Sequence, residues 1–336
     1  MKPTAKLRRT GLCLAGAATF WSLFWLCGGP PGQGVALAQE KTPLTVGMSW
    51  LWTGRHSWYF TAVEQGLYAK AGLDVKLIRG FGGGATAKNL AVNAIQFAEL
   101  DAATLIKARA EGVKVKLLSI HLRKSPFAFF ALRKSNIRAP KDMEGKTFGA
   151  PKFDVMRIFF PAYARLAGID ANKVNWVTFS PGSETASLLA GKIDVTTGFI
   201  DTFGGTLQAK GIDAVTFLFS DVGFTLYGSG IAASDAQVTS GAAIARKYVV
   251  ATNQAVAWTA RHPEEAIENL LKHHKTQDRK VMRVQLAMAV PLLGDLSKLG
   301  RMDEGEMKQT KEIVSKYMQL KKDVPLGEIY TNDFLK

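Results

Sequence analysis

The chain has 336 residues, of which 47% are hydrophobic and 21% charged, and its 43 lysines and arginines exceed the 28 acidic residues to give a formal net charge of +15. Plentiful aromatic residues, non-periodic glycine and the lack of a sustained heptad pattern exclude a disordered chain, a collagen helix and a coiled coil. At about 100 to 200 residues per domain, this length predicts two globular domains.

The first 38 residues have the pattern of a cleavable secretory signal peptide. Four basic residues precede an apolar stretch over 11–27, and Ala36-Leu37-Ala38 presents small residues where signal peptidase reads. We therefore expect cleavage before Gln39 and a periplasmic protein. The alternatives are an uncleaved membrane anchor, because about 17 apolar residues can just span a bilayer, a twin-arginine export signal at Arg8-Arg9, and a lipid anchor on Cys27, which the bulky residues before it disfavour.

Cleavage would remove both cysteines, Cys13 and Cys27, and would leave 39 basic and 28 acidic residues with a net charge of +11. The mature chain would have no thiol, which excludes disulfides, thiolate metal sites and cysteine nucleophiles. The basic residues are dispersed rather than gathered in one arm. This pattern favours a basic soluble surface over a nucleic-acid-binding one.

Short apolar strands alternate with helical stretches in the first half of the mature chain, which is the pattern of parallel sheets joined by crossover helices. The first α/β unit has predicted strands over 44–50, 73–79, 95–100 and 113–121, and predicted helices over 56–71, from a glycine turn at 80–84 to 93, and over 101–111.

A second α/β unit follows a strand at 127–132 and a charged, proline-containing connector at 133–141. Its predicted strands cover 146–150, 174–179, 193–197 and 214–219, and its predicted helices cover 154–167, 183–190 and 201–209. The pattern then changes to a strand at 224–233 and a mainly helical remainder, with helices over 243–261, 263–274, 280–293 and 303–320.

Five segments in colinear order resemble the nitrate/sulfonate/taurine solute-binding proteins of ABC importers, a family that includes thiamine-precursor (pyrimidine) binders. They are WLWTGRHSWYFTAVEQGLYAKAGLDV at 50–75, RGFGGG at 79–84, DMEGKTFGAP at 142–151, LLAGKIDV at 188–195 and WTARHPEEAI at 258–267. The resemblance implies an α/β, two-lobed periplasmic-binding-protein fold of type II with a helical C-terminal part, which closes around one small ligand.

In that fold the chain crosses between the lobes twice, and we expect the crossings near Leu132 and within 224–233. The predicted organisation is a signal peptide at 1–38, a first lobe made of 39–132 and 227–336, and a second lobe at 133–226. A rigid-body hinge at the crossings would close the lobes.

The glycine turn before the third helix resembles a dinucleotide-binding loop, but its spacing is incomplete and no acidic residue follows a second strand. We therefore interpret Gly82 and Gly83 as a helix N-terminus that faces the cleft between the lobes.

Ligands bind at the carboxyl ends of strands in open α/β sheets, so the candidate ligand residues are those that follow the predicted strands. The aromatic cluster at the first strand end can stack on a flat ligand, and the polar residues at later strand ends can bond to it. The candidates are Trp50, Trp52, His56, Tyr59, Gly82, Gly83, Asp101, Asp154, Arg157, Ser183 and Asp201.

A non-catalytic receptor is the favoured function over a hydrolase or a pyrimidine-synthase-like enzyme. The sequence has no G-x-S-x-G elbow or H-E-x-x-H helix, and the mature chain would have no cysteine for the synthase's cysteine-rich motif. We expect no metal, because the mature chain has neither cysteine nor an H-x-x-x-H pair, and no organic cofactor. The expected partners are a small ligand and an inner-membrane permease, with the protein itself a monomer and no nucleic acid bound. A flat heterocycle such as thiamine's pyrimidine precursor is the favoured ligand; a sulfonate, taurine or nitrate held by Lys152, Arg157 and the glycine turn is the alternative.

Overall fold

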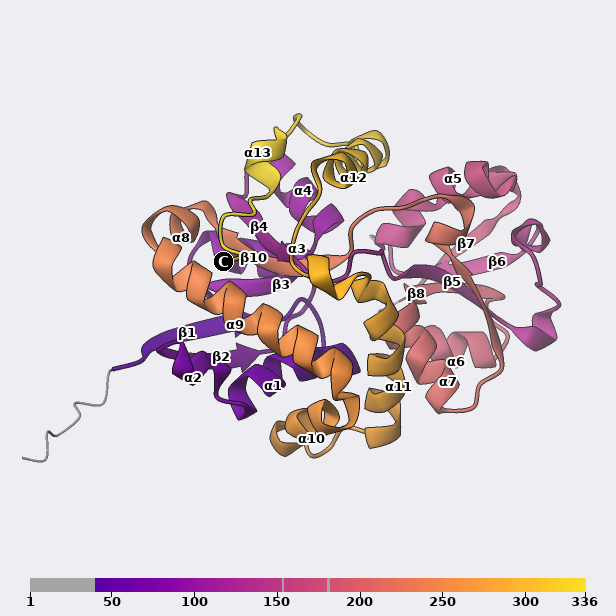
Figure 1. Ribbon diagram of the computed structural model, residues 1–336. Helices are drawn as coiled ribbons and strands as arrows, with labels where there is room; N and C mark the ends of the chain where they lie inside the picture. Colours follow the sequence, from indigo (N-terminus) through magenta and orange to yellow (C-terminus); the bar gives the residue numbers. More distant parts are fainter. Residues whose placement is uncertain (1–39, 153, 180–181) are drawn as a thin grey trace, which may run out of the picture. The chain divides into compact units, whose positions relative to one another are not determined.

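The computed structural model describes residues 40–152, 154–179 and 182–336. The predicted signal peptide therefore lies outside the described residues. Within the described part, no helix is both long and apolar enough to span a membrane. In the residues described, two five-stranded sheets are surrounded by helices (Figure 1), which confirms the predicted α/β class.

The first lobe is built on a sheet with the strand order β2-β1-β3-β10-β4. Strand β1 pairs in parallel with β2 and β3, whereas β10 runs antiparallel to both of its neighbours. The strands are β1 (Thr42–Gly47), β2 (Leu73–Ile78), β3 (Phe97–Asp101), β4 (Val115–Ile120) and β10 (Ser229–Ser234).

Helices of the first lobe come from both ends of the described chain, and Figure 1 shows α1, α3, α4 and α9 around its sheet. The early helices are α1 (Ser57–Glu64), α2 (Leu67–Lys70), α3 (Gly83–Ala91) and α4 (Ala102–Ala110). The later helices are α8 (Asp235–Ser240), α9 (Ala242–Arg261), α10 (Pro263–His273), α11 (Arg279–Ala289), α12 (Glu304–Tyr317) and α13 (Leu326–Ile329). The predicted helical C-terminal part is thus confirmed.

The second lobe is built on a sheet with the strand order β7-β6-β8-β5-β9, with β6 parallel to β7 and β8 and with β5 antiparallel to β8 and β9. Its strands are β5 (Phe127–Leu132), β6 (Thr147–Ala150), β7 (Asn175–Thr178), β8 (Val195–Phe199) and β9 (Ala214–Leu218). Its helices are α5 (Val155–Ala167), α6 (Glu184–Leu189), the π-helical turn η5 (Ile200–Gly204) and α7 (Gly205–Ala209).

The predicted change of lobe after Leu132 is wrong, because β5 belongs to the second sheet, between β8 and β9. All six residues of β5 are buried, so the strand is apolar on both faces and its sequence carries no alternation that would assign it to one sheet. The chain therefore leaves the first lobe within 121–126 and returns to it within 223–228.

The predicted helix over 56–71 is interrupted at Gly66. Gly66 has a φ of 66°, in the left-handed region that glycine enters without steric cost. Helix α1 ends before it and α2 begins after it. The break leaves α1 short, with its first six residues buried in the first lobe.

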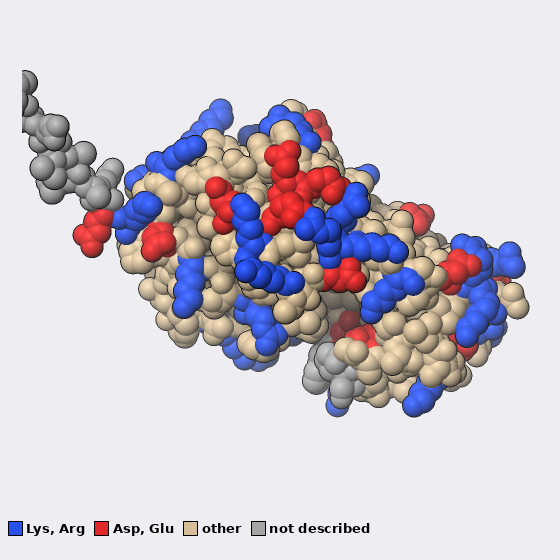
Figure 2. All heavy atoms as spheres, turned by 90° about the horizontal axis from the view of Figure 1, so that it is seen from below, with Lys and Arg blue, Asp and Glu red and all other residues tan. Residues whose placement is uncertain are grey.

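On the face that Figure 2 shows, basic residues are dispersed rather than gathered in one patch. On the face in Figure 2, the blue lysine and arginine side chains alternate with red acidic ones and with uncharged surface. On this face, the dispersed charge agrees with the interpretation of a basic soluble surface.

Candidate functional site

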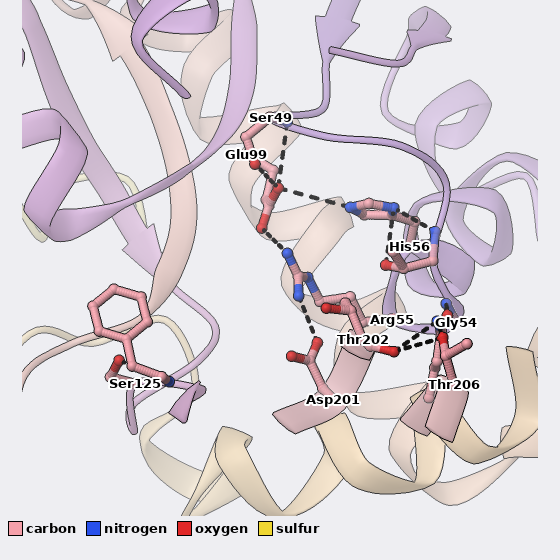
Figure 3. A network of polar contacts seen from close by, with 12 residues as sticks. Ser49, Gly54, Arg55, His56, Glu99, Ser125, Asp201, Thr202 and Thr206 are labelled. Atoms are coloured by element: carbon pink, nitrogen blue, oxygen red, sulfur yellow. Dashed lines mark hydrogen bonds and ion pairs between the residues drawn. The ribbon is translucent and has the colours of Figure 1, made fainter. Parts of the chain in front are cut away.

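A buried ion-pair cluster joins the two lobes at the carboxyl ends of their strands (Figure 3). Arg55 lies in a short 3-10 turn, η1 (Gly54–His56), that follows β1. Its guanidinium donates to Asp201 Oδ2 at 2.5 Å and to Glu99 Oε1 at 3.2 Å. Glu99 is on β3 of the first lobe and Asp201 is on η5 of the second, and all three side chains are at most 2% exposed.

At Arg55 and Glu99, the effect of nearby opposite charge outweighs that of burial. Burial alone lowers the pKa of Arg55, but the charges of Asp201 and Glu99 outweigh it and raise that pKa. For Glu99, burial is likewise opposed by Arg55 and by hydrogen bonds, one of them from Ser49 Oγ at 2.8 Å, so the pKa of Glu99 falls well below its usual range. One cation and two carboxylates give the cluster a formal charge of −1.

His56 borders the cluster as a neutral ring. Its Nδ1 accepts the backbone N–H of Thr53 at 3.0 Å, so the neutral imidazole carries its proton on Nε2, which lies 3.7 Å from Glu99 Oε2. Burial lowers the pKa of His56 despite the nearby carboxylate. The histidine therefore adds no positive charge to the site.

Gln285 of α11 makes a second connection between the lobes. Its Oε1 accepts the backbone N–H of Gly54 at 2.8 Å, and its Nε2 donates to Thr202 O and to Thr206 Oγ1, both at 3.1 Å. A Cβ on Gly54 would lie 2.1 Å from Met282 O, so only glycine lets η1 approach α11 this closely. This packing sets the position from which Arg55 reaches the second lobe.

Two exposed aromatic side chains lie on the loops after β1 and β2. Trp50 is 44% and Phe81 76% exposed, and the guanidinium of Arg79 lies 4.6 Å from the Phe81 ring. Backbone hydrogen bonds join the loops, from Gly80 N to Trp50 O and from Gly82 N to Ser49 O. Gly82 adopts a φ of 122° directly before α3, and Gly83 is the first residue of that helix.

Four polar candidates from the sequence follow other strands. Asp101 caps α4 by accepting Thr104 N at 2.8 Å, and burial raises its pKa. Asp154 caps α5 by accepting Met156 N and Arg157 N at 3.0 Å, and burial raises its pKa to about 6. Arg157 stacks over Trp176 at 4.9 Å and donates to Thr178 Oγ1, while Ser183 directly precedes α6.

Two of the predicted ligand aromatics, Trp52 and Tyr59, pack against other side chains of the first lobe. The Trp52 ring stacks on His274 at 4.5 Å between centroids and contacts Phe60 edge-on at 5.1 Å. Tyr59 is fully buried in the hydrophobic core of the first lobe. Tyr59 therefore has no exposed ring face for a ligand.

The predicted ligand residues did not include five residues of the site, namely Ser49, Arg55, Phe81, Glu99 and Gln285. The one available signal was Arg55 itself, a charged side chain in the otherwise aromatic and apolar segment WLWTGRHSWYF. Gln285 lies on a charged helix more than two hundred positions away, and nothing in its local sequence marks it. Within the described residues, no three histidine, cysteine or acidic side chains are grouped as metal ligands would be.

Comparison of the sequence with known proteins identifies a family and two relatives. The family model described as "NMT1/THI5 like" matches residues 53–266. The riboflavin-binding protein RibY of Chloroflexus aurantiacus is 25% identical over 305 residues, which cover 87% of this chain and 86% of RibY. The formylaminopyrimidine-binding protein of Halalkalibacterium halodurans is 25% identical over 228 residues, which cover 67% of this chain and 68% of that protein.

Solved structures share the fold. The alkanesulfonate-binding protein SsuA from Xanthomonas axonopodis pv. citri, bound to MOPS, superposes with a TM-score of 0.66 at 16% identity, covering 87% of this chain and 99% of SsuA. This likeness confirms the predicted two-lobed binding-protein fold. The resemblance found in the segments from 50 to 267 is also confirmed, and the chain belongs to the NMT1/THI5-like family.

Proposed function

We propose that this protein is an exported receptor of an ABC importer that binds a flat nitrogen heterocycle between its two lobes and delivers it to an inner-membrane permease. The observation that carries the proposal is the meeting of strand ends from both sheets at the Arg55–Asp201 contact. Ligands of open α/β sheets bind at such strand ends. The two relatives described above are binding proteins for riboflavin and for formylaminopyrimidine, which are both flat nitrogen heterocycles.

In this proposal the exposed rings of Trp50 and Phe81 are the stacking surfaces for the heterocycle. Asp101 and Asp154 are hydrogen-bond acceptors for its N–H groups, one from each lobe. Gly82, Gly83 and Ser183 border the same site at the starts of α3 and α6.

The receptor needs a hinge and no catalytic group. The lobes would rotate about the two crossings, at 121–126 and 223–228, and Asp201 would approach Arg55 as they close. Small-angle scattering should then give a smaller radius of gyration with ligand than without. A radius that does not change on confirmed binding would contradict hinge closure.

A thermal-shift screen followed by calorimetry tests the ligand class. The probes are riboflavin, 4-amino-5-hydroxymethyl-2-methylpyrimidine, taurine, MOPS and nitrate, each added to the purified chain from Gln39 onward. A ligand at 100 times its Kd adds about 2.7 kcal/mol to the free energy of unfolding. We expect a heterocycle to raise the Tm. If only taurine, MOPS or nitrate raises the Tm, the heterocycle hypothesis is wrong and the protein is an anion receptor.

Turnover and export have separate tests. Mass spectrometry of the ligand recovered after incubation should show it unchanged, whereas a modified product would indicate an enzyme. N-terminal sequencing of the exported protein should begin at Gln39. A mature chain that still contains Lys2 would contradict cleavage of the signal peptide.

A further inference from the structure

The ion-pair cluster between the lobes has more negative than positive charge. Arg55 is shared by Glu99 and Asp201, and the adjacent His56 is neutral. The guanidinium of Arg55 also lies 5.8 Å from the centroid of the Phe199 ring. Two guanidinium nitrogens of Arg55 are thus paired with carboxylates, while its Nε is buried without a hydrogen-bond partner among the described residues. The two carboxylates outnumber this one cation, so the cluster keeps a net negative charge.

Asp201 also has an unused acceptor. Its Oδ2 is taken by Arg55, whereas its Oδ1 is buried and has no hydrogen-bond partner among the described residues. Figure 3 shows this second oxygen directed away from Arg55, toward the side on which Ser125 of the first crossing lies. Burial of a carboxylate oxygen without a hydrogen-bond donor raises the free energy of the folded protein. The site is therefore suited to a ligand that donates a hydrogen bond to this oxygen.

We propose that Asp201 Oδ1 accepts a hydrogen bond from an N–H or O–H of the ligand, and that the negative cluster makes the receptor select an uncharged or cationic heterocycle over its phosphorylated or sulfonated form. This proposal rests on the proposed function, because it defines the charge class of the ligand at the same site. A phosphate or sulfonate near the cluster would face a like charge at low effective dielectric constant, where repulsion is strong.

The Arg55–Asp201 ion pair also has a purely structural explanation, in which it stabilises the contact between the lobes and does not bind the ligand. The two explanations differ in what they predict for paired ligands. A closing contact affects all ligands by the same factor, whereas an acceptor within a negative cluster changes the ratio between the uncharged ligand and its phosphate ester.

The experiment measures calorimetric affinities of two matched pairs: riboflavin with flavin mononucleotide, and 4-amino-5-hydroxymethyl-2-methylpyrimidine with its monophosphate. In the pair that binds, we expect the unphosphorylated member to bind about tenfold or more tightly than the ester. Equal affinities for the two members of a pair would show that the proposed selectivity is wrong, while the proposed function as a heterocycle receptor would still hold. Binding of taurine or MOPS with no binding of either pair would overturn both proposals.

The variant Asp201→Asn keeps the shape of the side chain and removes its charge. We expect this variant to bind the unphosphorylated ligand with lower affinity. The ratio of its affinity for the unphosphorylated ligand to its affinity for the phosphate ester should fall by about tenfold or more. The matched control is Asp221→Asn, an exposed aspartate of the same lobe, which should leave the ratio unchanged. Circular dichroism establishes that both variants fold. If Asp201→Asn weakens both members by the same factor, the contact serves closure alone and the proposal is wrong.

Discussion

Arg55 and Asp201, which are 146 positions apart in the sequence, form a buried ion pair of 2.5 Å that joins the first lobe to the second. Because Arg55 also bonds to Glu99 of its own lobe, the guanidinium connects a fixed carboxylate to one that would move with the hinge. Opening of the lobes would expose Asp201 to water and leave the Arg55–Glu99 pair in place.

Replacement of the central cation should destabilise the protein strongly. Arg55→Met keeps much of the side-chain volume but leaves Glu99 and Asp201 buried without their cation, which costs about 3 to 5 kcal/mol. Urea denaturation at pH 7 measures the change in the free energy of unfolding. The control is Arg133→Met, because the Arg133–Asp213 pair is exposed and contributes less than about 1 kcal/mol. Similar small losses in both variants would show that the cluster contributes little.

His121 should make the stability depend on pH. Burial lowers the pKa of this histidine to about 4, and its Nε2 lies 3.0 Å from Asn253 Oδ1. Its usual pKa in the unfolded chain is about 6.5, so the unfolded state binds the proton first as the pH falls. The neutral ring therefore contributes stability that is complete above about pH 6.5 and is lost toward pH 4, by up to about 3 kcal/mol.

The variant His121→Gln tests this pH dependence, since it retains a hydrogen-bond donor and cannot titrate. Its free energy of unfolding should fall less than that of the natural protein between pH 7 and pH 4. Acidic groups such as Glu99 contribute equally to both curves. Parallel curves for the two proteins would show that His121 does not titrate on unfolding.

Two glycines near the site should respond in opposite ways to alanine. A Cβ on Gly80 would lie 2.0 Å from Met48 O, so Gly80→Ala must displace the β1 loop at a cost of about 1 to 3 kcal/mol. A Cβ on Gly84, in the first turn of α3, meets no atom within 4 Å. Gly84→Ala should therefore stabilise the protein by about 0.5 to 1 kcal/mol. Thermal unfolding compares them, and equal Tm shifts would contradict the close approach of the loops.

Trp50 and Trp52 should separate ligand binding from stability. Trp50→Ala removes an exposed ring, so the affinity for a heterocyclic ligand should fall by about three- to tenfold with little change in Tm. Trp52→Ala removes a ring packed on Phe60 and His274 and should lower the free energy of unfolding by about 2 kcal/mol or more. Calorimetry and urea denaturation measure the two effects. If Trp52→Ala lowers the affinity without changing the stability, Trp52 rather than Trp50 contacts the ligand.

The fold class, most element positions and the family could be predicted from the amino-acid sequence. These features have local causes, such as the helical pattern over 243–261, which matches α9 (Ala242–Arg261), and the strand over 214–219, which matches β9. The polar strand-end residues Asp101 and Asp154 were also predictable, because a helix N-terminus selects a capping carboxylate from its own neighbourhood.

The sheet that contains β5 and the charges that meet between the lobes depend on long-range packing. A strand that is buried on both faces, as Phe127–Leu132 is, pairs according to the packing around it rather than its own pattern. Asp201 was predicted as a strand-end residue, but its partner Arg55 follows a different strand in the other sheet. Ion pairs of this kind depend on how distant segments come together in space, and no local periodicity or spacing encodes that distance.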